Sequence, residues 1–204
     1  GLASNSFGYD NLAAASDRPY GGTGSSYADP SLASFMGTLT YTLLDRYTLN
    51  LTTRADGSSM VGKDHTWGIF PSISATWDMK KESFLRNNKS ISLLNFRTGY
   101  GRSGNLGGIS SYLTLRQYIP VGLISYNGTP TVTMGTLRNS NPDLRWETRS
   151  TFNIGTDFGL FNNRLLLTAE YYYSKTTDML YEYDVPVPPF SFNKLLANIG
   201  SMSN

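Results

Sequence analysis

The chain has 204 residues and a nearly balanced charge, with 17 basic and 15 acidic residues, which excludes the strongly basic surface of a nucleic-acid-binding protein. It contains no cysteine, so disulfides and thiolate metal sites are excluded, and it has no apolar run long enough for a transmembrane helix. Charged residues make up 16% of the chain and aromatic residues 13%. This composition favours an all-β protein, and it is compatible with a membrane barrel, whose strands need only about 9–11 residues.

A loop and then a hairpin are expected at the start of the chain. Residues 1–31 are rich in Gly, Ser, Ala and Asn without periodicity, which predicts a loop. They show no signal-peptide pattern, so either a signal peptide has been removed or the chain is an excerpt of a longer protein. Apolar and polar residues alternate over 35–42 and 47–54, on both sides of a tight turn at 43–46. This pattern predicts two strands that share one apolar and one polar face.

The next expected strand, 67–77, carries a tryptophan at each end of one face. Trp67 and Trp77 are ten residues apart, which corresponds to roughly 33 Å of strand. Tilted by about 45°, this length becomes roughly 23 Å along a membrane normal, close to the apolar band of an outer-membrane barrel. Such bands are bordered by aromatic belts. Pro71 lies inside the strand and has no N–H, so we expect a bulge or weakened pairing there.

The second half of the chain predicts further strands separated by turns. One helical turn is expected within 78–90, followed by a strand at 91–100 with either a bulge near Leu93 and Leu94 or a strand start at Leu94. Residues 101–144 are expected to be mostly irregular, with short strands such as 131–134. The segment 141–175 then predicts a long hairpin closed at 159–163, in which Arg145, Glu147, Arg149 and Asp157 occupy odd positions and apolar residues even ones. Residues 197–204 are expected to enter another strand.

The expected connections alternate between short and long. The turns at 43–46 and 159–163 are short, whereas the connections at 55–66, 101–144 and 177–196 are long and polar. Short periplasmic turns and long extracellular loops are typical of bacterial outer-membrane barrels. A soluble β-sandwich also alternates its faces, but strand length, tryptophan spacing and loop asymmetry favour a barrel. We therefore expect Arg97, Glu147, Arg149 and Glu170 to line a wet interior, and Trp67, Trp77, Trp146 and Phe152 to face lipid.

Motifs for catalysis or cofactor binding are weak in this sequence. Residues 99–104 match G-x-G-x-x-G, but no helix-forming segment follows, so these glycines are expected to turn a strand end into a loop. His65 is the only histidine and is expected to be solvated. Glu147, Asp157 and Glu170 could form an acid–base pair for glycoside hydrolysis, but a charge-balanced ladder facing water is favoured. No catalytic residue, cofactor or metal site is therefore expected, and the chain is not expected to be an enzyme.

Three segments resemble the SusC/RagA family of TonB-linked outer-membrane proteins. They are DRYTLNLTTRADGSSMVGKDHTWGIFPSISATWDM, ISLLNFRTGYGRSGN and NPDLRWETRSTFNIGTDFGLFNNRL. Their order and spacing agree with the family over about 32–204, although Met60 and Val61 depart from the residues common in the family, and 105–140 shows no useful likeness.

The resemblance implies a partial antiparallel transmembrane β-barrel, with about six or seven strands of an expected 22-stranded barrel. Residues 1–204 would form part of one barrel domain without its plug domain. The resemblance further implies import of glycans or peptides across the bacterial outer membrane, driven by TonB through an N-terminal region absent here. A SusD-like surface lipoprotein and outer-membrane lipid would be its partners, and nucleic acid would not.

Two other classes of protein remain open at this point. One is a soluble β-sandwich carbohydrate-binding module, in which Trp67 and Trp77 would pack inside. The other is a β-rich glycoside hydrolase that uses Glu147 and Glu170. The sequence does not identify the substrate.

Overall fold

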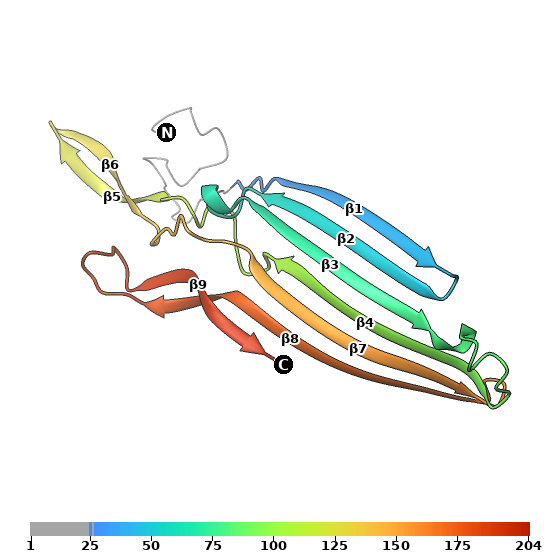
Figure 1. Cartoon of the computed structure of the whole chain (residues 1–204). Coiled ribbons are helices and arrows are strands. Elements are labelled where there is room, and N and C mark those ends of the chain that lie inside the picture. Colours follow the sequence, from blue (N-terminus) through green and yellow to red (C-terminus); the bar gives the residue numbers. More distant parts are fainter. Residues whose placement is uncertain (1–24, 26) are drawn as a thin grey trace.

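The computed structural model describes residue 25 and residues 27–204, so most of the loop expected at 1–31 lies outside the described residues (Figure 1). The described part consists of β-strands joined by turns and two short 3₁₀ turns, η3 (Lys63–His65) and η4 (Met79–Lys81). Within it, no helix is long and apolar enough to cross a membrane. The strands are β1 (Leu32–Leu43), β2 (Tyr47–Ser58), β3 (Trp67–Asp78), β4 (Ile91–Asn105), β5 (Tyr118–Tyr126), β6 (Thr129–Thr136), β7 (Glu147–Leu160), β8 (Leu165–Asp184) and β9 (Lys194–Ser203).

Seven of these strands form one antiparallel sheet in the order β1-β2-β3-β4-β7-β8-β9. Each strand pairs with the next one along the chain, except that the separate β5–β6 hairpin is inserted between β4 and β7. The sheet is a single layer (Figure 1). The prediction of an all-β antiparallel fold is confirmed. Among the described strands, β1 and β9 each pair on one side only, which leaves two open edges.

The connections at the two ends of the sheet differ in length. The β1–β2, β3–β4 and β7–β8 connections lie at one end, here called the short-turn end, and the β5–β6 hairpin and the β8–β9 turn lie at the other (Figure 1). Leu44 and Asp45 in the first turn have φ of 53° and 55°, as the two central residues of a type I′ turn require, and the Arg46 N–H donates to the carbonyl of Leu43 at 3.2 Å. Phe161, Asn162 and Asn163 in the β7–β8 turn also have positive φ.

Each of the three long connections begins later in the chain than expected, because the strand before it is longer. The expected ranges 55–66, 101–144 and 177–196 overlap strands, because β2 runs to Ser58, β4 to Asn105 and β8 to Asp184. The ends of β2 and β4 are polar, which by itself predicts loop, whereas in β8 the register shift around Asp178 interrupts the alternation. Main-chain pairing continues through them nevertheless, as in the pairs Asp56–Gly68 and Asn105–Glu147. A polar side chain at a strand end does not weaken a ladder that the backbone forms.

Irregularities in the sheet fall near the positions that the sequence indicated. The β4–β7 register shifts between Ile91 and Leu93, which confirms the expected bulge. Pairing between β2 and β3 is continuous through Pro71, but the β3–β4 ladder extends only from Ser72 to Asp78. The pairing is therefore interrupted next to the proline, as expected. The short strand expected at 131–134 is the centre of β6, whereas its partner β5 was not predicted.

The short-turn end is held together by Glu82, which lies in the β3–β4 connection. Its carboxylate accepts hydrogen bonds from Arg46 Nη1 at 2.8 Å, Tyr47 Oη at 2.5 Å and Trp77 Nε1 at 3.0 Å. These partners come from the β1–β2 turn, β2 and β3, so one carboxylate ties that turn and two strands to the β3–β4 connection. The hydrogen bonds from Tyr47 and Trp77 lower the pKa of Glu82 below its usual value.

We expect Glu82→Gln to lower the stability of this end at neutral pH and to make it less sensitive to acid. A carboxyl group with a lowered pKa in the folded state stabilises that state above its unfolded pKa of about 4.3. This contribution is lost as the pH falls through the folded pKa. The midpoint of heat unfolding of the full-length protein, measured between pH 7 and pH 3, should therefore fall with acid in the parent and converge on that of the variant. Parallel curves over this range would contradict the assignment.

Candidate functional site

The two faces of the sheet differ in chemistry, and the register defines them. Residues paired side by side across the strands form rows. One apolar row consists of Leu39, Leu51, Ile73, Tyr100, Phe152 and Tyr173, all between 38% and 62% exposed. The next row on the opposite face consists of Thr40, Asn50, Ser74, Gly99, Asn153 and Tyr172. The sheet therefore has one apolar face that the described residues leave uncovered and one mainly polar face.

All four residues predicted to line a wet interior lie on the polar face. Arg97 and Glu170 flank Gly155 in one row, because Arg97 pairs with Gly155 and Gly155 with Glu170. Glu147 and Arg149 precede Gly155 on β7 by even numbers of residues, so they lie on the same face. The polar face thus collects side chains of both signs.

An ion pair crosses β4 and β7 at the Arg97 row. Arg97 Nε and Nη2 donate to Asp157 Oδ2 and Oδ1 at 2.9 and 3.1 Å, and Thr168 Oγ1 donates to Oδ1 at 3.0 Å. Gly155 lies between the two side chains, and a Cβ there would be in ordinary contact with both, at 3.5 Å from Arg97 Nη2 and 3.7 Å from Glu170 Cγ. The bidentate geometry fixes the arginine and leaves the Glu170 carboxylate exposed to the solvent beside it.

The register places Glu147 too far from Glu170 for these two residues to form an acid–base pair. Thr148 pairs with Thr177, so Glu147 lies eight residues along the ladder from the Glu170 row, which is about 26 Å. Glycosidases hold their two carboxyl groups about 5–9.5 Å apart. Glu147 instead accepts from Asn105 Nδ2 at 3.4 Å, and Arg149 Nη2 donates to Ser174 Oγ at 3.2 Å. The hypothesis of a hydrolase using Glu147 and Glu170 is therefore wrong.

Aromatic pairs occupy both ends of the apolar face. Trp67 stacks on Phe35 with ring centroids 5.9 Å apart, and Trp77 stacks on Tyr47 at 6.0 Å. The two pairs lie at opposite ends of β3 and span most of its length. This is the arrangement that an apolar band bordered by two aromatic belts requires.

Trp146 does not belong to these belts, and the prediction that it faces lipid is wrong. It precedes β7 and packs edge-to-face on Phe70, with centroids 5.5 Å apart, and its indole N–H donates to the carbonyl of Thr66 at 3.4 Å. Phe70 fills the region where β3 and β4 are not paired, and a Cβ on Gly104 would lie 2.1 Å from its ring. The even number of Trp146 therefore does not assign it to the apolar face, because the strand begins only at Glu147.

The long connections pack together around Leu144, whose side chain is fully buried. Val61, Ile109 and Leu113 complete this apolar cluster, here called the loop core, and Trp146 and other partly buried residues pack against it. Val61 comes from the β2–β3 connection, and the other three come from the segments that flank the β5–β6 hairpin. The long-loop end is therefore folded rather than irregular.

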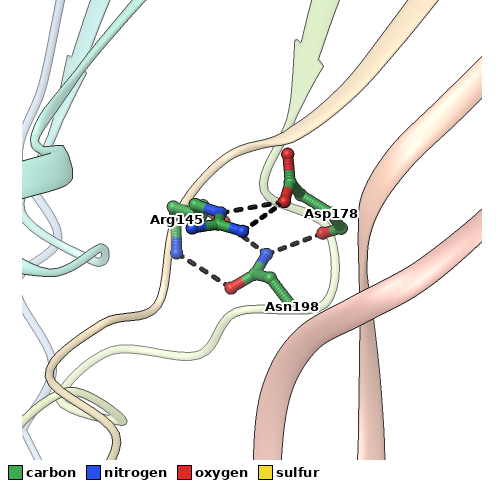
Figure 2. A network of polar contacts seen from close by, with 3 residues as sticks. All are labelled: Arg145, Asp178 and Asn198. Atoms are coloured by element: carbon green, nitrogen blue, oxygen red, sulfur yellow. Dashed lines mark hydrogen bonds and ion pairs between the residues drawn. The ribbon is translucent and has the colours of Figure 1, made fainter.

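A polar network fixes the chain just after Leu144 (Figure 2). Arg145 Nε and Nη2 donate to Asp178 Oδ1 at 2.9 and 2.5 Å. The side-chain amide of Asn198 accepts from the Arg145 N–H at 3.0 Å and donates to the Arg145 and Asp178 carbonyls at 2.8 and 2.7 Å. Asp178 has φ of 58° and lies where the β8–β9 register shifts, so this bulge directs its carboxylate to Arg145.

Two asparagines attach the same segment to the β8–β9 turn. Asn139 Nδ2 donates to the carbonyls of Phe192 and Lys194 at 2.6 and 2.8 Å. Asn141 Nδ2 donates to the carbonyl of Leu196 at 2.9 Å. These contacts connect the β6–β7 segment to the far edge of the sheet.

Gly62 has no room for a side chain, which gives a stability prediction. Its N–H donates to the carbonyl of Leu144 at 2.6 Å, and a Cβ would lie 2.0 Å from the carbonyl oxygen of Pro142. Gly62→Ala should therefore open the loop core, at a cost of about 1–3 kcal/mol typical of overpacking. Gly37→Ala is the control, because a Cβ on Gly37 meets nothing within 4 Å. Limited proteolysis of the full-length protein should cut the Gly62 variant faster within 101–144, and equal rates for both would contradict the expectation.

The other motifs carry no site in the described residues. Gly99, Gly101 and Gly104 lie inside β4, so the G-x-G-x-x-G match neither opens a helix nor turns the strand into a loop, as had been expected. They give room to neighbouring strands and to Phe70 instead. His65 is half-buried in η3. In residues 25 and 27–204, no three His, Cys, Asp or Glu side chains are grouped as metal ligands.

The site residues that the sequence does not predict belong to the loop core and to the side-chain hydrogen bonds that attach it to β8 and β9. Arg145 was noted only for its position in the alternation, and Asn139, Asp178 and Asn198 were not noted. The available signal was the segment NPDLRW, whose turn-forming residues and buried leucine stand directly before a strand. Its partners on β8 and β9 depend on a bulge that no local pattern reveals.

A single-layer antiparallel meander, apolar on one face and bordered by aromatic pairs, defines a wall segment of a transmembrane β-barrel. The model of the TonB dependent receptor-like β-barrel family matches residues 2–204, and the chain belongs to this family.

Relatives and solved structures agree with this family. The chain is 35% identical over 204 residues to "TonB-dependent receptor P26" of Formosa agariphila, covering all of the chain and 20% of that protein. It is 37% identical over 183 residues to "TonB-dependent receptor SusC" of Bacteroides thetaiotaomicron, covering 85% of the chain and 18% of that protein. The RagAB peptide importer in its "open-open" state matches with a TM-score of 0.76 and 27% identity, covering 90% of the chain and 20% of that structure. The chain thus spans about a fifth of these relatives.

Proposed function

We propose that the chain forms part of the wall and long loops of an outer-membrane transporter that imports nutrients with energy from TonB. The apolar face, with its aromatic pairs, contacts lipid. The polar face, with Arg97, Glu147, Arg149 and Glu170, lines the lumen. The long connections, including the loop core and the β5–β6 hairpin, lie outside the cell. The rest of the barrel, the plug domain and the segment that contacts TonB belong to the remainder of the protein.

The observation that carries this proposal is the uncovered apolar row, which crosses the sheet from Leu39 to Tyr173. Soluble proteins rarely expose an apolar surface of this extent. In a soluble carbohydrate-binding sandwich, a second sheet would cover that face and enclose Trp67, yet Trp67 is 52% exposed. A face that remains apolar while every strand is paired within the sheet fits a bilayer.

We propose a SusD-like surface lipoprotein as partner and a glycan or a peptide as substrate. A peptide is supported by the similar solved structures, which are described as a RagAB peptide transporter and importer, and a glycan is the other class that the resemblance to the SusC/RagA family implies. The lumen-facing groups support a polar substrate of either kind, because they include both charges and hydroxyl groups. The chain is proposed to bind and guide substrate without converting it.

Uptake by cells that carry the full-length protein tests this function. Labelled oligosaccharides and labelled peptides should be offered separately, with and without TonB, and fractionation should locate the protein. We expect a heat-modifiable outer-membrane protein and TonB-dependent uptake of one of the two classes. A protein that is soluble without detergent, or uptake that is independent of TonB, would contradict the proposal. Hydrolysis of the substrate by the purified protein would contradict its passive role.

A further inference from the structure

Positive charge is concentrated at the short-turn end of the sheet. The β1–β2, β3–β4 and β7–β8 connections, residues 43–46, 78–90 and 161–164, contain six basic and three acidic residues. The rest of the chain contains 11 basic and 12 acidic residues. The net positive charge of the chain therefore resides in these three turns.

Three of the six cations are engaged within the protein. Arg46 forms an ion pair with Glu82 at 2.8 Å, and Lys81 forms one with Asp78 at 3.1 Å. Lys80 Nζ donates to the carbonyls of Leu85, Arg86 and Asn88 at 3.0, 3.3 and 2.7 Å. The chain from 85 to 88 thus wraps its carbonyl groups around one ammonium group.

The other three cations, Arg86, Lys89 and Arg164, are exposed. Among the described residues, their side chains form no ion pair or hydrogen bond. The two turns that carry them are hydrogen-bonded to each other. The Phe161 N–H donates to the carbonyl of Ser90 at 2.9 Å, and the Asn163 N–H donates to Ser92 Oγ at 2.9 Å.

Large apolar side chains project from the same turns. Leu44, Phe84 and Phe161 are 63%, 69% and 60% exposed. The turns are also fixed to the aromatic pair of Tyr47 and Trp77, because Glu82 accepts a hydrogen bond from each of these two side chains. Aromatic belts mark the membrane interface, so cations one turn beyond the belt lie at the depth of the lipid headgroups. Apolar tips beside basic residues are the composition of surfaces that bind the interface.

We propose that Arg86, Lys89 and Arg164, flanked by Phe84 and Phe161, form a binding site for the headgroup of an anionic phospholipid in the leaflet on the short-turn side. This proposal rests on the proposed function, because it requires the apolar face to be in the membrane. The guanidinium and ammonium groups bind the phosphate, and the aromatic tips enter the acyl boundary. The site holds the short-turn rim of the wall to its leaflet.

Lipid titration of the full-length protein in neutral detergent tests this site. Phosphatidylglycerol and phosphatidylcholine should be added separately, and retained lipid should be counted by native mass spectrometry. The test variant carries Arg86→Gln, Lys89→Gln and Arg164→Gln. The control carries Lys63→Gln, Arg116→Gln and Arg138→Gln, which remove the same charge from exposed positions at the long-loop end. Heat-modifiable mobility shows that each variant is folded.

We expect the parent and the control to retain phosphatidylglycerol in preference to phosphatidylcholine, and the test variant to lose that preference. Each cation near an anionic surface contributes a factor of about five in binding, and added salt should weaken the parent only. Equal retention by a folded test variant, or equal loss in the control, would overturn the site. If fractionation finds the parent outside the membrane, the proposed function itself fails, which distinguishes the two failures.

Discussion

Tyr171→Arg should destabilise the folded protein by about 2–4 kcal/mol, the cost of a cation on the lipid face near the middle of a bilayer. Tyr171 is 62% exposed, pairs with Ile154 on the apolar face and lies six residues from the start of β8 at the short-turn end. Six residues of a strand tilted by about 45° correspond to roughly 14 Å along the membrane normal, which is close to the middle of an apolar band of about 25 Å. Phe152→Arg, on the same face, should act in the same direction.

Tyr172→Arg is the matched control for this experiment. Tyr172 is the next residue of the same strand, has the same side chain, is 51% exposed and lies on the polar face. Its replacement should change stability by no more than about 0.5 kcal/mol. The free energy of unfolding of the full-length protein in bilayers measures both. Equal effects of the two substitutions would mean that the two faces do not meet different solvents.

Leu144→Ala should destabilise the loop core by about 2–5 kcal/mol, the usual cost of truncating a buried leucine. Leu144 is completely buried among side chains from three segments of the chain, and its carbonyl accepts the Gly62 N–H at 2.6 Å. The barrel wall does not depend on this contact, so the loss should be local. Hydrogen exchange at the Gly62 amide should accelerate while exchange in the centre of β7 stays unchanged.

Leu137→Ala serves as the comparison for the loop core. Leu137 belongs to the same segment between β6 and β7 but is 39% exposed. Its truncation removes the same atoms with little burial, so the exchange of the Gly62 amide should stay close to that of the parent. Slow exchange in both variants would show that Leu144 does not hold the long connections together.

The fold of the wall could be predicted because each strand has its own period of two. The alternation at Phe152, Asn153 and Ile154 is enough to give a strand and to assign its faces, and the register confirms it. The tight turns at 43–46 and 159–163 could be predicted because each one separates two alternating segments. The expectation that this sheet is part of a closed barrel came from the family resemblance, because no periodicity indicates closure.

The loop core could not be predicted, since its contacts join residues that are far apart in the chain. Arg145 reaches Asp178, and Leu144 reaches Val61, across distances that a local pattern does not encode. Trp146 was misplaced for a related reason. Its parity matched the apolar face, but the strand begins one residue later, and Phe70 holds its ring in the gap beside β4.

The shortened ladder between β3 and β4 has a mechanical consequence. From Ser72 to Asp78, β3 is joined to β4 by main-chain hydrogen bonds, and from Trp67 to Pro71 it is not. Near the long-loop end, the seam is bridged by the contact of two aromatic rings, Phe70 and Trp146. At that end, the link between strands β1–β3 and the strands from β4 onward therefore depends on this ring contact and on the loop core, in which the Gly62 N–H donates to the carbonyl of Leu144. Lateral stress on the wall at this end would therefore load side-chain and loop contacts rather than a β3–β4 main-chain ladder.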